Sequence, residues 1–206
     1  VKNWGDNSVF GNVYFRKIEN VINRVNTIFN DTILNRIYTN VGQANVLGIE
    51  LGTTVYPTDG WRIYFGGNIY SYGIEGSLFG DGINTSNTVY SINANSTVNL
   101  SPTFSLQLAL NYLSERITAQ GEDSRFYNPS LSLKKSFLDK RLTLGLLWRN
   151  IDLGLLNSNE QRITTVRDNF FTTTNYVYEV DILQLTVSYQ LNQVAKKLKL
   201  TESEFG

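Results

Sequence analysis

Apolar and polar side chains alternate along much of this chain, and the clearest stretch runs from Phe104 to Tyr112. Successive side chains of a β-strand point to opposite faces. One face of this stretch is therefore apolar, and it carries Phe104, Leu106, Leu108, Leu110 and Tyr112. A tilted strand of this length spans roughly 20 Å, close to the roughly 25 Å apolar band of an outer-membrane barrel. The pattern predicts a strand that crosses a membrane.

The same alternation recurs from end to end, and turn-forming residues separate the repeats. Together these signals predict about eight antiparallel strands. We expect them at residues 8–28, 33–56, 61–76, 87–100, 104–118, 126–137, 141–152 and 175–191. The predicted fold class is all-β, with antiparallel strands of a transmembrane β-barrel over residues 1–191, followed by a polar periplasmic tail at 192–206.

Short and long connections alternate between these strands. The short ones are expected at 57–60, 101–103 and 138–140, and the long, polar ones at 77–86, 119–125 and 153–174. Outer-membrane barrels have short periplasmic turns and longer extracellular loops. We therefore expect the outer membrane of a Gram-negative bacterium, with the loops extracellular and the C-terminus periplasmic. The short hairpin at Asn30-Asp31 is an exception, and we expect its arms to project beyond the membrane as a ribbon.

Aromatic residues mark the ends of the predicted apolar band. Trp61, Phe104 and Phe137 each lie beside a short turn, and Tyr112 closes the other end of its strand. Such positions are typical of the aromatic girdles of a membrane barrel. Lys135 interrupts the apolar face next to this girdle, where a lysine reaches the headgroups and costs only about 0–1 kcal/mol.

The face opposite the apolar one is rich in Ser, Thr, Asn and Gln. An eight-stranded barrel closed on itself has room only for its own side chains, whereas larger barrels enclose a channel or a plug. Small polar residues indicate a wide lumen that is wet or plugged. Several charges are also expected to face inward and to contact water or a plug: Arg16, Glu50, Arg62, Lys134 and Arg149.

Composition removes several classes of function. The 206 residues suit one domain, and 18 basic residues balance 18 acidic ones, so nucleic-acid binding is not expected. Histidine and cysteine are both absent, which removes the usual catalytic bases, nucleophiles and metal ligands. We expect neither an enzyme nor a cofactor. The oxygens at Gly80-Asp81-Gly82 and Glu122-Asp123 are too few for a calcium site. Because residue 1 is not methionine, we expect a processed or truncated start.

Four segments resemble the C-terminal barrel portion of TonB-dependent outer-membrane receptors of the Bacteroidetes type: Val13–Arg24, Tyr38–Leu51, Ile117–Gly121 and Leu133–Leu138. Members of that family are single chains of about 22 strands around an N-terminal plug. The resemblance implies that this chain supplies roughly the last eight strands. It further implies as partners the outer-membrane lipid, a plug, the rest of the barrel, a surface lipoprotein, and TonB through the plug.

Three functions remain open. The first is a transport component, the barrel wall of a TonB-dependent nutrient importer. The second is a structural or adhesion protein in which the eight strands close alone into a small barrel. A soluble ligand-binding barrel is disfavoured, because soluble barrels keep their outward residues polar. Sequence upstream of Val1 would separate the first two, since an importer needs a plug-like domain there.

Recognition is expected at the long loops, because loops of a barrel meet the outside whereas strands serve as scaffold. The loop at 153–174 is the longest, and 77–86 carries an apolar pair flanked by glycines. Candidate ligand or partner contacts are the aromatics near this rim: Tyr72, Phe79, Trp148, Phe170 and Phe171.

Overall fold

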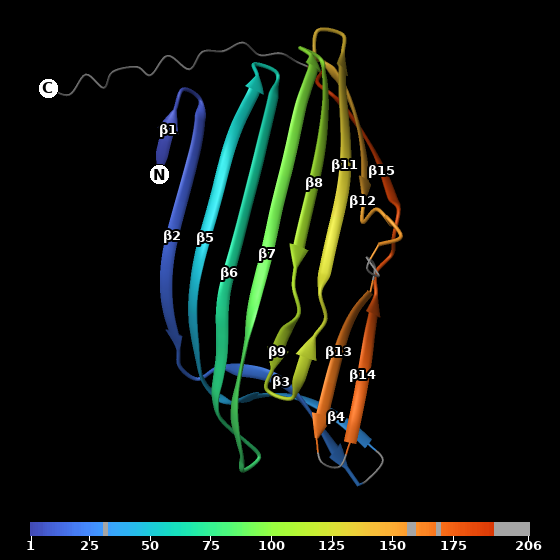
Figure 1. The fold of residues 1–206 in the computed structure, drawn as a ribbon. Helices are drawn as coiled ribbons and strands as arrows, with labels where there is room; N and C mark the ends of the chain where they lie inside the picture. Colours follow the sequence, from blue (N-terminus) through green and yellow to red (C-terminus); the bar gives the residue numbers. More distant parts are fainter. Residues whose placement is uncertain (31–32, 156–159, 168–169, 192–206) are drawn as a thin grey trace, which may run out of the picture.

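The computed structural model describes residues 1–30, 33–155, 160–167 and 170–191 (Figure 1). Within these ranges all regular structure is β-strand and every pairing between strands is antiparallel, which confirms the predicted fold class. The same ranges contain no helix long and apolar enough to cross a membrane.

The main sheet has nine strands in simple up-and-down order. They are β1 (Lys2–Trp4), β2 (Asn7–Ile18), β5 (Gly42–Thr58), β6 (Trp61–Leu78), β7 (Asp81–Ser101), β8 (Phe104–Leu113), β11 (Phe126–Phe137), β12 (Leu142–Arg149) and β15 (Ile182–Tyr189). β1 has only three residues, and the other strands correspond to the eight predicted ones. In the described residues, β15 pairs with β12 alone, so the sheet ends there with an open edge.

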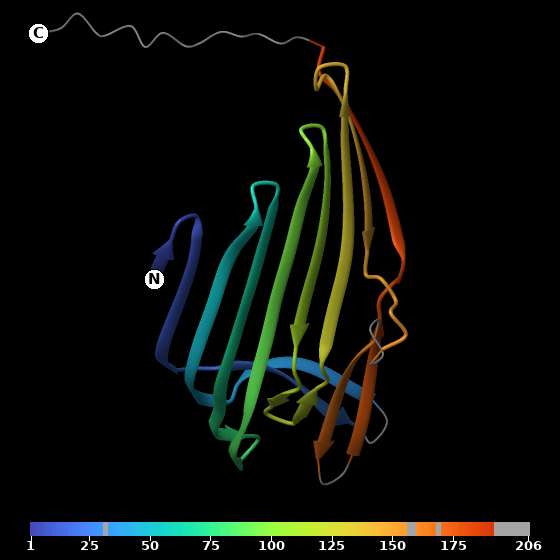
Figure 2. The same cartoon turned by 45° about the horizontal axis from the view of Figure 1, so that its top comes forward.

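Two smaller sheets lie together at the end opposite the short turns (Figures 1 and 2). One is the hairpin of β3 (Ile22–Phe29) and β4 (Ile33–Asn40). The other has the order β14 (Phe170–Val177), β13 (Glu160–Arg167), β10 (Gly121–Asp123) and β9 (Arg116–Thr118). In both views the β3–β4 hairpin leaves the end of β2 and crosses beneath the sheet towards β13 and β14. The predicted ribbon exists, but it turns across the end of the sheet.

Four predicted strands are broken in the structure: 8–28, 33–56, 104–118 and 175–191. The last two each divide between sheets, because β9 and β14 belong to the four-stranded sheet whereas β8 and β15 belong to the main one. β2 ends at Ile18 and β3 begins at Ile22, while β4 ends at Asn40 and β5 begins at Gly42. Asn20 has φ 58 and Gly42 has φ 119, conformations that bend the chain sharply. Alternation continues on both sides of each bend, so the pattern alone could not reveal it.

The three predicted long loops also carry strands. β6 and β7 extend through 77–86 and meet at a turn at Phe79-Gly80, and β10 lies within 119–125. The stretch 153–174 holds β13 and the first part of β14. These extensions carry polar side chains on both faces and so lack the amphipathic alternation of a membrane strand. The tight turns predicted near 57–60, 101–103 and 138–140 are present.

Strand register keeps like side chains together. Leu131 on β11 lies opposite Leu108 on β8 and Trp148 on β12. This produces one continuous apolar face, and it is open to the surroundings: Leu108 is 50% exposed and Leu185 is 69% exposed. Because a protein in water buries such side chains, the exposed face fits contact with lipid.

The buried apolar core lies elsewhere, at the end where the β3–β4 hairpin folds across the sheet. It consists of Val21, Val25, Val41, Ala44, Ile74 and Leu78. Val21 and Val41 are tied together by their backbones, since Val41 N donates to Val21 O at 2.9 Å. The hairpin is thus packed onto the sheet.

Candidate functional site

A polar cavity of ≈ 800 Å³ lies on the polar face of the sheet, where β2, β5 and β6 pass beside β9. The strand register brings its lining residues side by side: Glu50 on β5 lies opposite Asn12 on β2 and Asn68 on β6. The polar side chains that line it are Asn12, Tyr14, Arg16, Glu50, Asn68, Tyr70, Tyr72 and Arg116. Hydroxyl, amide, carboxylate and guanidinium groups therefore converge on one space.

Gly48 shapes this cavity. It lies between Tyr14 on β2 and Tyr70 on β6, and a Cβ at position 48 would meet the Tyr14 ring at 2.6 Å and Tyr70 Cβ at 2.7 Å. The missing side chain therefore lets the Tyr14 ring lie against the strand. Its hydroxyl then donates to Asn68 Oδ1 at 3.0 Å, which fixes the ring's orientation.

Arg116 comes from β9, which reaches the cavity from the loop end of the molecule. Its guanidinium donates to Asp123 Oδ2 at 2.9 Å on the neighbouring strand β10. Arg16 and Glu50 supply one charge of each sign on the sheet itself. The arrangement suits hydrogen bonding to a polar solute or to another polypeptide.

The register places all the predicted inward charges on the polar face. Arg16 and Glu50 line the cavity. Arg62 lies opposite Thr97, Lys134 opposite Ser105, and Arg149 opposite Ser130. The latter three therefore face the same side of the sheet but lie outside the cavity.

The structure does not bring the five predicted recognition aromatics together. Tyr72 lies in the cavity and packs against the buried core. Phe79 is half exposed at the tip of the β6–β7 hairpin, and Phe170 and Phe171 lie on β14. Trp148 lies on the apolar face, opposite Leu183, and its Nε1 donates to Asp181 Oδ1 at 2.9 Å. The five therefore do not form one cluster, because nearness along the chain does not decide which face a strand residue occupies; their contact with a ligand or partner stays a prediction. Residues 156–159 and 168–169 of the long loop lie outside the described residues.

Sequence reasoning did not single out five of the polar cavity residues: Asn12, Tyr14, Asn68, Tyr70 and Arg116. Tyr14 and Tyr70 stand two positions from Arg16 and Tyr72, so period-two alternation from those candidates points to them. Arg116 carried no comparable signal, because its place depends on how β9 folds at the loop end.

A buried polar bridge holds the β3–β4 hairpin to the four-stranded sheet. Asn26 N donates to Gln120 Oε1 at 2.7 Å, and Gln120 Nε2 donates back to Asn26 O at 3.0 Å. The Asn26 amide also donates to Thr165 Oγ1 at 3.1 Å. Nearby, Arg24 and Arg36 both donate to the Tyr176 hydroxyl, at 3.0 and 3.1 Å. The hairpin is therefore fixed at both its apolar and its polar side.

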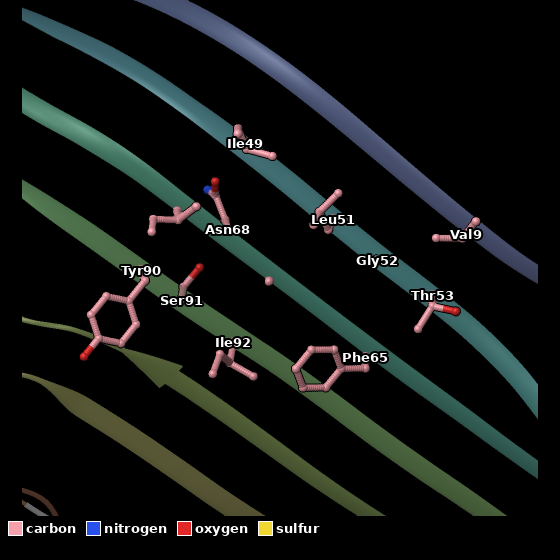
Figure 3. Close-up of a pocket in the computed structure, with 12 residues that line it drawn as sticks. Val9, Ile49, Leu51, Gly52, Thr53, Phe65, Asn68, Tyr90, Ser91 and Ile92 are labelled. Atoms are coloured by element: carbon pink, nitrogen blue, oxygen red, sulfur yellow. The ribbon is translucent and has the colours of Figure 1, made fainter. Parts of the chain in front are cut away.

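The predicted girdle residues Trp61, Phe104 and Phe137 lie at the short-turn end, on strands whose apolar sides form one face. Tyr112, at the opposite end of β8, stacks on Tyr90 of β7 with ring centroids 5.7 Å apart. Between the two ends, an apolar hollow of ≈ 580 Å³ opens on the same face (Figure 3). Ile49, Leu51, Phe65, Tyr90 and Ile92 surround it.

Among the described residues, no group of three or more His, Cys, Asp or Glu side chains is placed to hold a metal ion. This applies to the oxygens at Gly80-Asp81-Gly82 and Glu122-Asp123.

Comparison with known proteins gives one match. Residues 2–189 match the model of a family described as "Outer membrane protein beta-barrel family". The search of curated proteins and the search of solved structures each gave no match.

Proposed function

Because this chain belongs to the outer membrane protein beta-barrel family and is thus an outer-membrane protein, we propose that it forms part of the barrel wall of a TonB-dependent nutrient importer. The family match spans almost the whole of the described sheet. Transport itself, the plug and TonB are inferences that go beyond the family. They draw on the resemblance of the sequence to such receptors and on the observations below.

The observation that carries this proposal is the open sheet. In the described residues, β15 pairs with β12 on one side only, and the free side of β2 is covered only by the three-residue β1. A spanning sheet needs every backbone group paired within the bilayer, so open edges call for further strands. The importer supplies them, together with a plug against the polar face.

The polar cavity supports the same proposal. A narrow, self-filled barrel would occupy its interior with packed or charge-paired side chains, whereas this face leaves ≈ 800 Å³ open beside Arg16, Glu50 and Arg116. In the importer this space faces the lumen, where plug or substrate reaches it. The loop end, with the β3–β4 hairpin, then faces the outside and meets a surface lipoprotein, and the short turns and C-terminus face the periplasm.

Cysteine cross-linking tests this proposal directly, because the chain has no native cysteine. In a barrel closed by these strands alone, β15 would lie beside β2. Val13→Cys is therefore combined in turn with Leu183→Cys, Leu185→Cys and Val187→Cys, all in whole cells. Disulfides need Cα atoms roughly 4.4–6.8 Å apart. Leu146→Cys with Leu185→Cys, which are register partners, provides the positive control.

The importer proposal expects a cross-link in the control and none in the three test pairs. A cross-link between β2 and β15 would overturn it in favour of the second candidate, a small structural or adhesion barrel. One observation favours that alternative: the loop end exposes apolar side chains such as Phe29, Tyr38 and Phe171, as an adhesion surface would.

Recognition at the loop end is tested by deleting residues 155–172. This removes β13 and the start of β14, including Thr165, which binds Asn26. We expect loss of uptake or partner binding while the main sheet still folds into a heat-resistant form. Normal transport by a folded deletion protein would place the selective contacts in the polar cavity or the plug.

A further inference from the structure

We propose that the apolar face carries a defined binding site for one membrane phospholipid, with its phosphate on Lys135 and an acyl chain in a hollow further along the sheet. This site is separate from the polar cavity and does not depend on transport. It follows from the position of Lys135, which lies among apolar side chains at the short-turn end of this face.

Lys135 is held in place by its surroundings. Its Nζ lies 5.6 Å from the centre of the Phe104 ring and 5.9 Å from that of Phe137, and it donates to Thr103 Oγ1 at 3.2 Å. Its register partners on the two neighbouring strands are Phe104 on β8 and Leu144 on β12. Two rings and one hydroxyl therefore fix the ammonium group at the level of the short turns.

Within the part of the chain that the structure describes, the ammonium group has no anionic partner. Ion pairs among the described residues are Lys17–Glu19 and Arg116–Asp123, and neither involves Lys135. The neighbouring turn adds Lys140 and Arg141 against the single acid Asp139. At the boundary of a bilayer, the anion available to such a cation is a lipid phosphate, and charge-assisted hydrogen bonds to phosphate are strong.

The same face also offers a hollow for the acyl chain of the lipid. From Lys135, Leu133 and Leu131 lead along β11 to Pro129, which lines a hollow of ≈ 340 Å³ together with Phe65, Ala94, Leu108 and Leu110. Small residues at Ala94 and Ser96 leave this space between larger neighbours. Four to six strand residues separate Lys135 from the hollow, or roughly 13–20 Å, comparable to the roughly 15 Å depth of one leaflet.

Native mass spectrometry of the full protein, extracted from membranes in mild detergent, tests the site. Phosphatidylglycerol and a diacylglycerol with the same chains are the probes. Lys135→Gln removes the cation, and Lys134→Gln makes the same change one residue away on the opposite face. We expect Lys135→Gln to lower retention of phosphatidylglycerol about tenfold, with Lys134→Gln and the diacylglycerol little changed.

Two further variants complete the test. Ala94→Leu fills the hollow and should lower retention of both probes, whereas Asn93→Leu, on the opposite face, should not. If Lys135→Gln fails to fold, Thr103→Val decides, because it removes the hydroxyl that positions Nζ and should weaken phosphatidylglycerol binding several-fold.

Equal effects of Lys135→Gln and Lys134→Gln would overturn the proposal. So would displacement of the lipid by millimolar inorganic phosphate, which would assign the site to the free anion.

Discussion

Two isoleucines on one strand show how differently the two ends of this molecule are stabilised. Ile74 is fully buried in the core beneath the β3–β4 hairpin, whereas Ile69, five residues earlier on β6, is 52% exposed on the apolar face. The loop end builds an interior of its own, as a protein in water must. The membrane end leaves its apolar side chains outside, because hydrocarbon covers them there.

The two ends of the molecule also differ in where their polar side chains lie. At the loop end, Asn26 and Gln120 are buried and satisfy each other's hydrogen bonds. In the spanning part of the sheet, strand alternation places most polar side chains on one face, and Lys135 and Ser96 are exceptions on the other. Packing therefore determines the loop end, whereas periodicity determines the spanning sheet, and the following substitutions test this contrast.

The largest effect is expected for Ile74→Ala. Removing this side chain leaves a cavity in the loop-end core, at a cost of about 2–5 kcal/mol in the free energy of unfolding. Ile69→Ala is the control and should cost much less, because lipid tails fill the space that it leaves. Urea unfolding from lipid vesicles measures both. Equal losses would mean that the two ends are stabilised in the same way.

Next in size is Leu108→Arg, at mid-strand on the apolar face. A charge there should cost about 2–4 kcal/mol of folding into bilayers. Gln107→Arg is the control, since its side chain faces the polar side and should be tolerated far better. The same vesicle assay applies. A penalty of similar size at Gln107 would show that the two faces were assigned wrongly.

A smaller effect is expected for Gln120→Leu. Its amide serves the buried N–H and C=O of Asn26, and leaving them unsatisfied should cost about 1–3 kcal/mol. The loss should appear locally, as faster hydrogen exchange in β3 and earlier proteolysis of the hairpin. Gln43→Leu, which changes a glutamine at the surface beside Glu75, is the control. Unchanged hydrogen exchange in β3 would show that the hydrogen bonds between Asn26 and Gln120 do not stabilise the hairpin.

The smallest effect concerns the girdle. Trp61 Nε1 donates to Ser96 Oγ at 2.9 Å on the neighbouring strand. Loss of this bond in Ser96→Ala should cost about 0.5–1.5 kcal/mol. A double-mutant cycle with Trp61→Phe isolates the bond. Once Trp61→Phe has removed the donor, Ser96→Ala should lower the stability little further. Fully additive losses would show that the indole acts through its contact with lipid alone.

The sequence by itself determined the strands of the spanning sheet and the face of each residue. Leu108 and Gln107 needed no tertiary information, because alternation with period two is a local property of an extended chain. The short turns and the polar face carrying Arg16 and Glu50 followed from the same rule. The places of Trp61 and Phe104 beside the short turns did as well, since they are set by distance along a strand; their role in an aromatic girdle stays a prediction.

Only the tertiary structure determined how the loop end folds and which residues meet in the sites. The bends at Asn20 and Gly42 turn the hairpin across the sheet, and only that fold brings Asn26 to Gln120, 94 residues away. Arg116 shares the cavity with Tyr14 and Tyr70 because β9 leaves the main sheet at the loop end. Trp148 is separated from Tyr72 because the two lie on opposite faces. Contacts between distant segments depend on where each strand bends and which strand it meets, and these are properties of the packed chain that no local periodicity encodes.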